Sequence, residues 1–355
     1  IPAPILVNPQ DFSRASELEG LKYVVNYKEP IALINDNYKN DFEMRKHAQG
    51  GRIEYVVTDE NLYSDFLQSS KQTPYKFLSD KDPDFKGAVG AIISTDVMCV
   101  RVEDKTKMIG RDGYMDPEMP SALNAIISFG EFLKYCAGEK FDIDPREFKS
   151  GWRPYQMDNN EISSIELWIS DNLENGAGYT RQLGKKEYLK ETLHRGYKIF
   201  KNSWEKEEHV NCDSSCHDCI RNYSNRFIHP SLDWRLALDL AEISLGLNLD
   251  TDRWLKNAKH HASLFVQFCE MNGMSVQLEE LNGLTGIINS RTRKAMILMH
   301  PLWHKYSGLI NNQLVRQAIQ VLSGDFENHE PVFADIRDFS RRPMNYYKEL
   351  LKDKQ

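Results

Sequence analysis

The sequence predicts a mixed α/β fold, of the α+β kind, divided into more than one domain. The chain has 355 residues, more than the usual size of about 100 to 200 residues for one domain. Its composition, 41% hydrophobic and 27% charged, is typical of a globular protein with a buried core. Runs of β-branched and aromatic residues alternate with amphipathic helical repeats. We therefore expect a module of helices and sheet followed by a small α/β domain.

Residues 1–85 are expected to form a β-rich N-terminal segment. Short runs rich in β-branched and aromatic residues, which are typical of strands, are separated by polar breaks. These runs cover residues 21–27, 30–36 and 51–60. A longer strand-like stretch follows over 84–104. Because the chain begins with Ile rather than Met, we also expect it to be a piece of a longer protein.

Residues 86–260 are expected to form the central module. Its first helix is predicted over 121–138, where Ser121 can cap the start and apolar residues recur with helical spacing. A turn-rich connection over 141–152 leads to a strand and a glycine-containing turn over 163–179. Three more helices are predicted over residues 185–202, 231–246 and 250–273.

The tail, residues 261–355, is expected to be the small α/β domain. Its segments have the order strand, strand, helix, strand. They read "MSVQLEEL", "KAMILMHPLW", "NNQLVRQAIQVLSG" and "PVFADIRDF". No internal repeat and no low-complexity linker separates the domains, so the boundaries near 85 and 260 are drawn from composition alone.

Three cysteines crowd into eight residues, with Cys-x3-Cys-x2-Cys spacing: Cys212, Cys216 and Cys219. Short turns can bring such thiols to one tetrahedral ion, and zinc in structural sites takes four Cys or His donors. We therefore predict a structural Zn²⁺ that holds the module together. A redox Cys-x2-Cys is disfavoured, since the strand-to-helix context is missing. A catalytic zinc is disfavoured too, because four protein donors leave no open position.

The fourth zinc ligand is open between two histidines and a distant cysteine. His229 is our choice, because it lies ten residues past Cys219, at the entrance of the next predicted helix. His209, three residues before Cys212, and Cys136 are the alternatives.

The segment "CDSSCHDCIRNYSN…HPSLDWRLALDLA" resembles the MrfA-type zinc-binding domain found C-terminal to DEAD/DEAH-box helicases. The same domain occurs in the anti-phage defence proteins DrmB of DISARM and DruE of Druantia. Other stretches match in the family's order, so that the resemblance covers roughly residues 85–250. They read "AIISTDVMCVRV", "MPSALNAIISFGEFLKYCAGEKFDIDPREF" and "IELWISDNLENGAGY". In the MrfA branch a fourth cysteine falls near "FDIDPREF", where this chain has none.

The resemblance implies an accessory zinc-binding module of a helicase-linked bacterial anti-phage defence system. Its implied partners are DNA and a DEAD/DEAH-type helicase, in the same chain or as a separate subunit. No Walker A loop occurs in the sequence, so we expect no ATP hydrolysis by this chain alone, and no catalytic residue is predicted. No apolar stretch of about 20 residues and no signal peptide is seen, so we expect a cytoplasmic protein without a membrane partner.

Any DNA contact is expected to be local, because the chain is acidic overall. Its formal net charge is −7, whereas a dedicated nucleic-acid coat is usually basic. The candidate phosphate contacts are Arg291, Arg293, Lys294, Arg341 and Arg342. The alternative is that these residues are ordinary solvated surface.

Two other classes of function stay open. Carboxylates of the tail could form a metal-dependent nuclease if they converge on one place, which spacing cannot show. The residues considered for it are Glu279, Glu280, Lys294, His300 and Asp335. A pure protein–protein scaffold is the second alternative, and a wide exposed apolar face would favour it.

Overall fold

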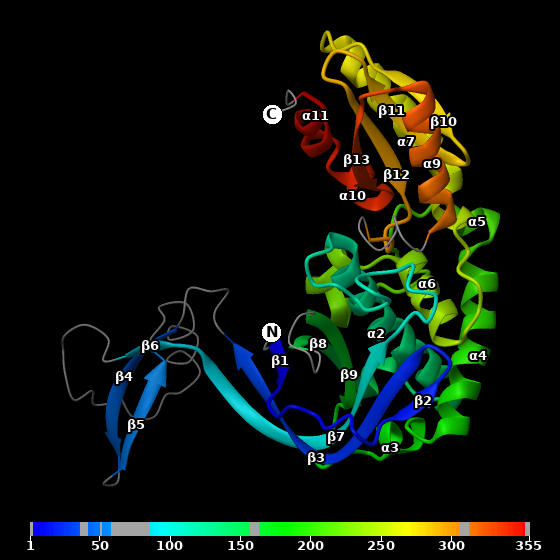
Figure 1. Ribbon diagram of the computed structural model, residues 1–355. Helices are drawn as coiled ribbons and strands as arrows, with labels where there is room; N and C mark the ends of the chain where they lie inside the picture. Colours follow the sequence, from blue (N-terminus) through cyan, green and yellow to red (C-terminus); the bar gives the residue numbers. More distant parts are fainter. Residues whose placement is uncertain are drawn as a thin grey trace.

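The mixed α/β, multi-domain fold is confirmed by the computed structural model, which describes residues 3–35, 42–49, 52–57, 85–156, 163–304 and 312–351. Its described strands form three sheets. A central sheet lies against a group of helices, a second sheet belongs to the C-terminal region, and a small third sheet stands apart at the end of a long hairpin (Figure 1). None of the described helices is long and apolar enough to cross a bilayer.

The central sheet has the order β1-β3-β7-β9-β8, with β2 on β3, and its pairs are antiparallel. Its strands are β1 (Ala3–Leu6), β2 (Ser16–Leu18), β3 (Leu21–Asn35), β7 (Val89–Val102), β8 (Phe148–Gln156) and β9 (Ser163–Asp171). Side chains alternate along β7: Met98 and Val100 join the main core, whereas Val97 and Cys99 join a smaller core on the other face. The sheet is therefore covered on both faces at its centre.

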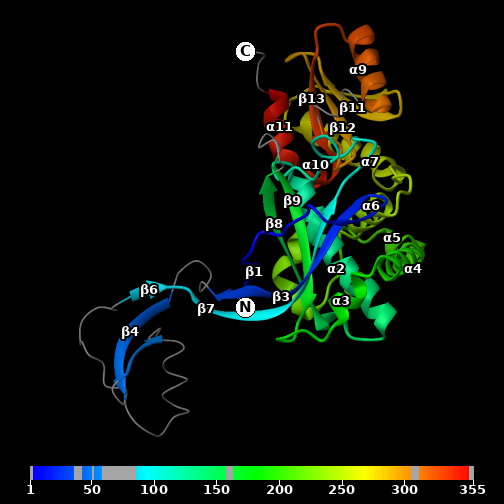
Figure 2. The same ribbon diagram turned by 60° about the horizontal axis from the view of Figure 1, so that its bottom comes forward.

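Strands β3 and β7 form a hairpin that extends well beyond the central sheet (Figures 1 and 2). It ends in a three-stranded sheet of order β5-β4-β6. The strands of this sheet are β4 (Phe42–Gln49), β5 (Arg52–Val57) and β6 (Phe85–Gly87). The sequence predicted two strands over 21–27 and 30–36. The structure has one, because a register shift between Asn26 and Glu29, with Lys28 at φ 57°, absorbs the polar break.

Helix α2 (Pro120–Phe141) is the centre of the module and packs on β8 and β9. It also packs against α4 (Lys186–Trp204) and α6 (Trp234–Ser244). Shorter elements complete the module: η2 (Pro145–Glu147), α3 (Tyr179–Leu183), α5 (Glu207–Val210) and η3 (Tyr223–Ser231). The turn-rich connection predicted over 141–152 is η2 followed by the start of β8.

The start of α2 differs from the sequence-based expectation. Met119 occupies the N-cap position without a side-chain cap, and Pro120 is at the first turn, where a missing N–H costs nothing. The hydroxyl of Ser121, expected to cap the helix, instead donates a hydrogen bond to Asp335 of the C-terminal region.

The C-terminal sheet has the order β10-β11-β12-β13, with only β12 and β13 parallel. Its strands are β10 (Gln277–Leu281), β11 (Leu284–Asn289), β12 (Lys294–Met299) and β13 (Glu330–Asp335). Its helices are α7 (Asp252–Met271), α9 (Gln313–Asp325), α10 (Ile336–Arg341) and α11 (Pro343–Leu351). Strand β11 was not expected from the sequence. Asn282 and Gly283, both with positive φ, form the two-residue turn that starts it.

The module and the C-terminal sheet are joined by buried polar contacts. The guanidinium of Arg337 donates from Nε to Oδ2 of Asp233 over 2.9 Å. The amide of Gly110 donates to the carbonyl of Leu302 over 2.8 Å. Asp335 caps α10 by accepting hydrogen bonds from two backbone amides and also accepts one from Ser121. Since α7 also packs on β10 and β11, it belongs physically to the C-terminal region although it begins before residue 260.

We predict that Asp335→Asn stabilises the fold at neutral pH. Burial raises the pKa of Asp335 to about 6, so the folded protein binds this proton more tightly than the unfolded chain does. Wild-type stability therefore falls as pH rises from about 4 to 6, and a neutral amide that keeps the cap avoids this loss. The expected gain in unfolding free energy at pH 7.5 is about 1 to 2 kcal/mol, because one pKa unit is about 1.4 kcal/mol and the residue is only half-buried.

Urea unfolding of both proteins at pH 7.5 and pH 4.5 measures this difference. The two proteins should be nearly equal at pH 4.5. A variant that is less stable than wild type at both values would show that Asp335 is stabilised as a carboxylate.

Candidate metal centre

The zinc loop, defined here as residues 209–219, connects the end of α4 to the core of the module. Arg235, in the first turn of α6, holds this loop through hydrogen bonds. Its guanidinium donates to the carbonyls of Val210, Cys212 and Asp213 over 2.9 to 3.0 Å. The amide of Trp234 donates to the carbonyl of Ser214 over 2.9 Å. The backbone conformation of the loop is therefore fixed by hydrogen bonds to the start of the buried helix α6.

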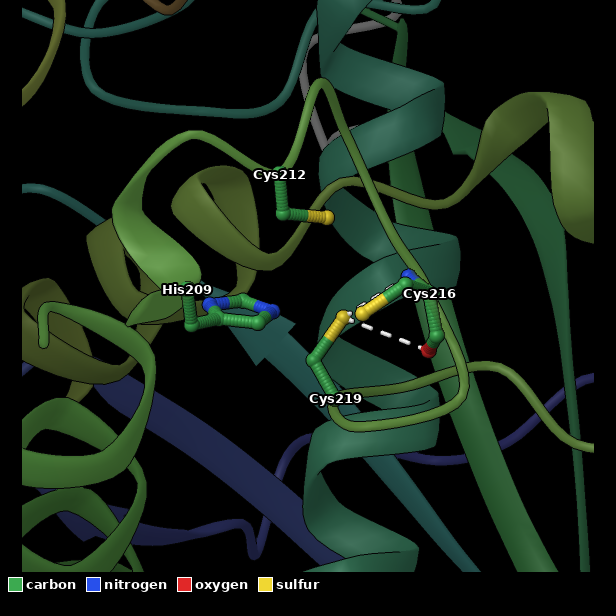
Figure 3. Close-up of side chains that lie close together, drawn as sticks. All are labelled: His209, Cys212, Cys216 and Cys219. Carbon is green, nitrogen blue, oxygen red and sulfur yellow. Dashed lines mark hydrogen bonds between the residues drawn. The ribbon is translucent and has the colours of Figure 1, made fainter. Parts of the chain in front are cut away.

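The structure brings four ligand-type side chains of this loop to one point: His209, Cys212, Cys216 and Cys219 (Figure 3). One ligand atom from each lies within 4.8 Å of all the others. Two sulfurs bound to one tetrahedral zinc at about 2.3 Å would be about 3.8 Å apart. The cluster could therefore hold a zinc ion with only a small contraction of its side chains.

His209, on α5, has the hydrogen-bonding pattern of a zinc ligand. Its Nδ1 lies 2.8 Å from the carbonyl oxygen of Trp204. Its Nε2 is buried and has no hydrogen-bond partner among the described residues. Zinc-bound histidines commonly donate from one ring nitrogen to a carbonyl and bind the metal through the other. A metal at the cluster would satisfy the unpartnered Nε2, so the residues present fit a Cys3His zinc site.

His229, the fourth ligand chosen from the sequence, lies outside this cluster. Its Nε2 is 3.0 Å from the carbonyl oxygen of Asn222 and 2.9 Å from Oδ1 of Asn225. It lies within η3, whose turns point it at this polar pocket and not at the thiols. Cys136 is buried on α2 beside Gly196 of α4. We therefore revise the candidate fourth ligand to His209.

Burial keeps the thiols of Cys212 and Cys219 neutral when no cation is bound. It raises the pKa of Cys212 to about 11, with the neighbouring Cys216 adding to the effect, and that of Cys219 to about 12. Because zinc binds thiolates, metal binding must displace these protons.

The predicted phosphate contacts are scattered, and not all of them are accessible. Arg291 and Arg293 are exposed in the turn between β11 and β12. Lys294 is buried, and its Nζ donates to the carbonyl of Glu349. Arg342 is exposed and paired with Asp338 over 2.9 Å. Arg341 donates to the carbonyl of Pro230 over 3.1 Å. Lys294 is therefore poorly placed to contact a phosphate.

The carboxylates considered for a nuclease do not meet. Glu279 and Glu280 lie on β10, and Asp335 lies at the end of β13, so they are on opposite edges of the sheet. His300 is fully buried, with Nε2 3.4 Å from Asp239. Within the described ranges, the cluster at His209 is the only group of three or more ligand-type side chains placed to hold a metal.

Comparison with curated proteins finds similarity to a Druantia protein. Druantia protein DruE of Escherichia coli (strain UMEA 4076-1) is 25% identical over 261 residues, which cover 68% of this chain and 13% of DruE. This chain is a homologue of DruE. The resemblance predicted from the sequence is thus confirmed, although the chain spans only about an eighth of the length of DruE.

No family model matches the chain. Among solved structures, the crystal structure of the DUF1998 helicase MrfA bound to DNA is similar, with a TM-score of 0.29 and 10% sequence identity. The match covers 64% of this chain and 26% of that chain. A likeness of this size carries no conclusion about the site.

We predict about one zinc per chain and a faster loss of zinc from His209→Ala than from His229→Ala. The reason is geometric, since only His209 directs a free ring nitrogen at the thiols. Removing one of four ligands should speed release to a chelator by about tenfold or more. Elemental analysis and a colorimetric chelator assay on the wild type and both variants measure this.

His229→Ala is the matched control, because it also removes a half-buried histidine from the same region. Cys216→Ser should lower the zinc content. Equal release rates from the two histidine variants would show that His209 is not the fourth ligand.

Proposed function

We propose that this chain is an accessory zinc-binding module of a helicase-linked bacterial anti-phage defence system, and that it contacts DNA, the helicase motor or both. The homology with DruE carries this proposal, since it covers 68% of this chain. The helicase is part of the same polypeptide or a separate subunit. A cytoplasmic location belongs to the same proposal.

The role proposed for zinc is structural. The four donors His209, Cys212, Cys216 and Cys219 would fill a tetrahedral shell and leave no position for a substrate. Bound there, the ion would fix the loop that links α4 to α6. The surface built on this loop would then be rigid enough to meet DNA or a motor domain.

The proposed DNA contact uses phosphates and not base edges. Arg291 and Arg293 project from the turn between β11 and β12, and a guanidinium can bind a phosphate through two parallel hydrogen bonds. Phosphate contacts give no sequence preference, and the affinity they supply falls steeply with salt.

A protein–protein scaffold is the second candidate, and the hairpin of β3 and β7 favours it. Apolar side chains on this hairpin are open to solvent: Ile92 is 70% exposed, Tyr27 58% and Val89 42%. Exposed apolar groups that gather on one element are typical of protein-interaction surfaces.

We predict that the chain binds DNA weakly, that its helicase strengthens the binding, and that Arg291→Glu with Arg293→Glu weakens it equally for all sequences. Loss of two phosphate contacts should lower the affinity about tenfold or more and reduce the salt slope by about 1 to 2. Fluorescence anisotropy with single- and double-stranded DNA over a salt series, with and without helicase, measures this.

Lys186→Glu with Lys190→Glu is the matched control, because it makes the same charge change on exposed positions of α4. This control should bind almost as wild type does. Absence of DNA binding in either setting, with helicase association intact, would leave the scaffold as the better assignment.

A further inference from the structure

A second pocket lies beside the zinc loop and outside the cluster of thiols. It has a volume of about 270 Å³ and lies between the zinc loop, the starts of α6 and α7, and α10. Basic side chains dominate its lining. They are Arg235, Arg253, Arg337, Arg341, His260 and His261. They come from three separate helices, so no local sequence pattern reveals the pocket.

Two of these arginines form no direct ion pair with a carboxylate. Arg253 is paired with Asp239 and Glu242, and its side chain is 3% exposed. By contrast, neither Arg235 nor Arg341 forms an ion pair with any residue that the structure describes. Both donate hydrogen bonds to neutral backbone carbonyls. The charge of Arg253 is therefore balanced by direct partners, whereas Arg235 and Arg341 have no such direct partner.

Arg337 supplies an unsatisfied hydrogen-bond donor at the pocket. The residue is 5% exposed, and its Nε is bonded to Asp233. Its Nη2 is buried and has no hydrogen-bond partner among the described residues. A buried donor without an acceptor costs free energy, and a small rotation of this side chain toward the pocket would let a ligand oxygen recover it.

The electrostatic environment of Arg341 points the same way. Burial lowers the pKa of its guanidinium and the nearby Arg337 lowers it further, although Asp233 and Asp213 oppose this shift. The net effect penalises a positive charge, and a bound anion would offset it. Two acidic residues also line the pocket, but Asp233 is already paired with Arg337, and Asp213 is exposed at its edge.

We propose that this pocket binds a single phosphate group, either of a nucleic acid strand or of a free phosphate compound. Its volume is below the range of about 300 to 1,000 Å³ that is usual for whole small-molecule ligands, so it suits one group and not a complete nucleotide. Guanidinium groups match phosphate oxygens in both geometry and charge. The nucleic-acid source rests on the proposed function, whereas the phosphate site itself does not.

The zinc loop forms one wall of this pocket. Val210, Asn211 and Asp213 line it, and Arg235 holds the carbonyls of Val210 and Asp213 while it faces the pocket. A loop that unfolds when zinc leaves would release Arg235 and open this wall. Phosphate binding should therefore depend on zinc although no phosphate contacts the metal.

Isothermal titration of the full, zinc-loaded chain with inorganic pyrophosphate tests the proposal. Arg341→Gln should weaken binding about tenfold, which is the usual loss for one charge-assisted hydrogen bond. Arg342→Gln is the matched control, because the neighbouring Arg342 is exposed, paired with Asp338 and absent from the pocket lining. Circular dichroism and zinc content show that each variant is folded.

If Arg341→Gln fails to fold, a second variant tests the same pocket. Asn257, which is exposed and lines the pocket, can be changed to Asp with almost no change in shape. The added negative charge should weaken pyrophosphate binding. Chelation of zinc should weaken it too.

Competition with a 5′-phosphorylated and a 5′-hydroxyl oligonucleotide identifies the source of the phosphate. Stronger competition by the phosphorylated strand indicates a strand end, and equal competition indicates an internal phosphate. Pyrophosphate binding without competition by either strand supports the site as one for a free phosphate compound and counts only against the DNA contact. No pyrophosphate binding, or equal losses in Arg341→Gln and Arg342→Gln, would overturn the proposal.

Discussion

Helix α6 is buried along its whole length although it carries charged side chains, and the surrounding structure is arranged to neutralise them. A buried charge is costly unless it is paired and hydrogen-bonded. The charges on α6 together contact three other parts of the chain. Arg235 holds the zinc loop, Asp239 binds Arg253 and Trp254 of α7, and Glu242 binds Tyr197 of α4. Three segments are thus ordered around one helix.

Local patterns of the sequence predicted much of this fold. The long helices were expected close to their observed places, because their apolar residues recur with helical spacing. The three cysteines were recognisable because short turns bring them together without help from the rest of the chain. The exposed arginines of the β11–β12 turn were also visible as candidates, but the burial of Lys294, which lies at the start of β12 and contacts α11, was not.

Features that depend on distant contacts could not be predicted. His209 faces the thiols because α5 follows the end of α4 and because Trp204 orients its ring, and neither cause shows in the spacing of residues. The phosphate pocket joins residues of α6, α7 and α10 that are far apart in sequence. By contrast, strand β11 had a visible signal, the pair Asn282 and Gly283 with positive φ, which favours a tight hairpin turn.

The hairpin of β3 and β7 has a mechanical consequence. Strand β7 runs without interruption from Val89, close to the small outer sheet, to Val102, deep in the central sheet. A pull on the outer sheet along this direction is carried by the covalent backbones of β3 and β7. It therefore acts on the central sheet, where β7 pairs with β9 at Val97 to Val100, so a load on the outer sheet reaches the core of the module.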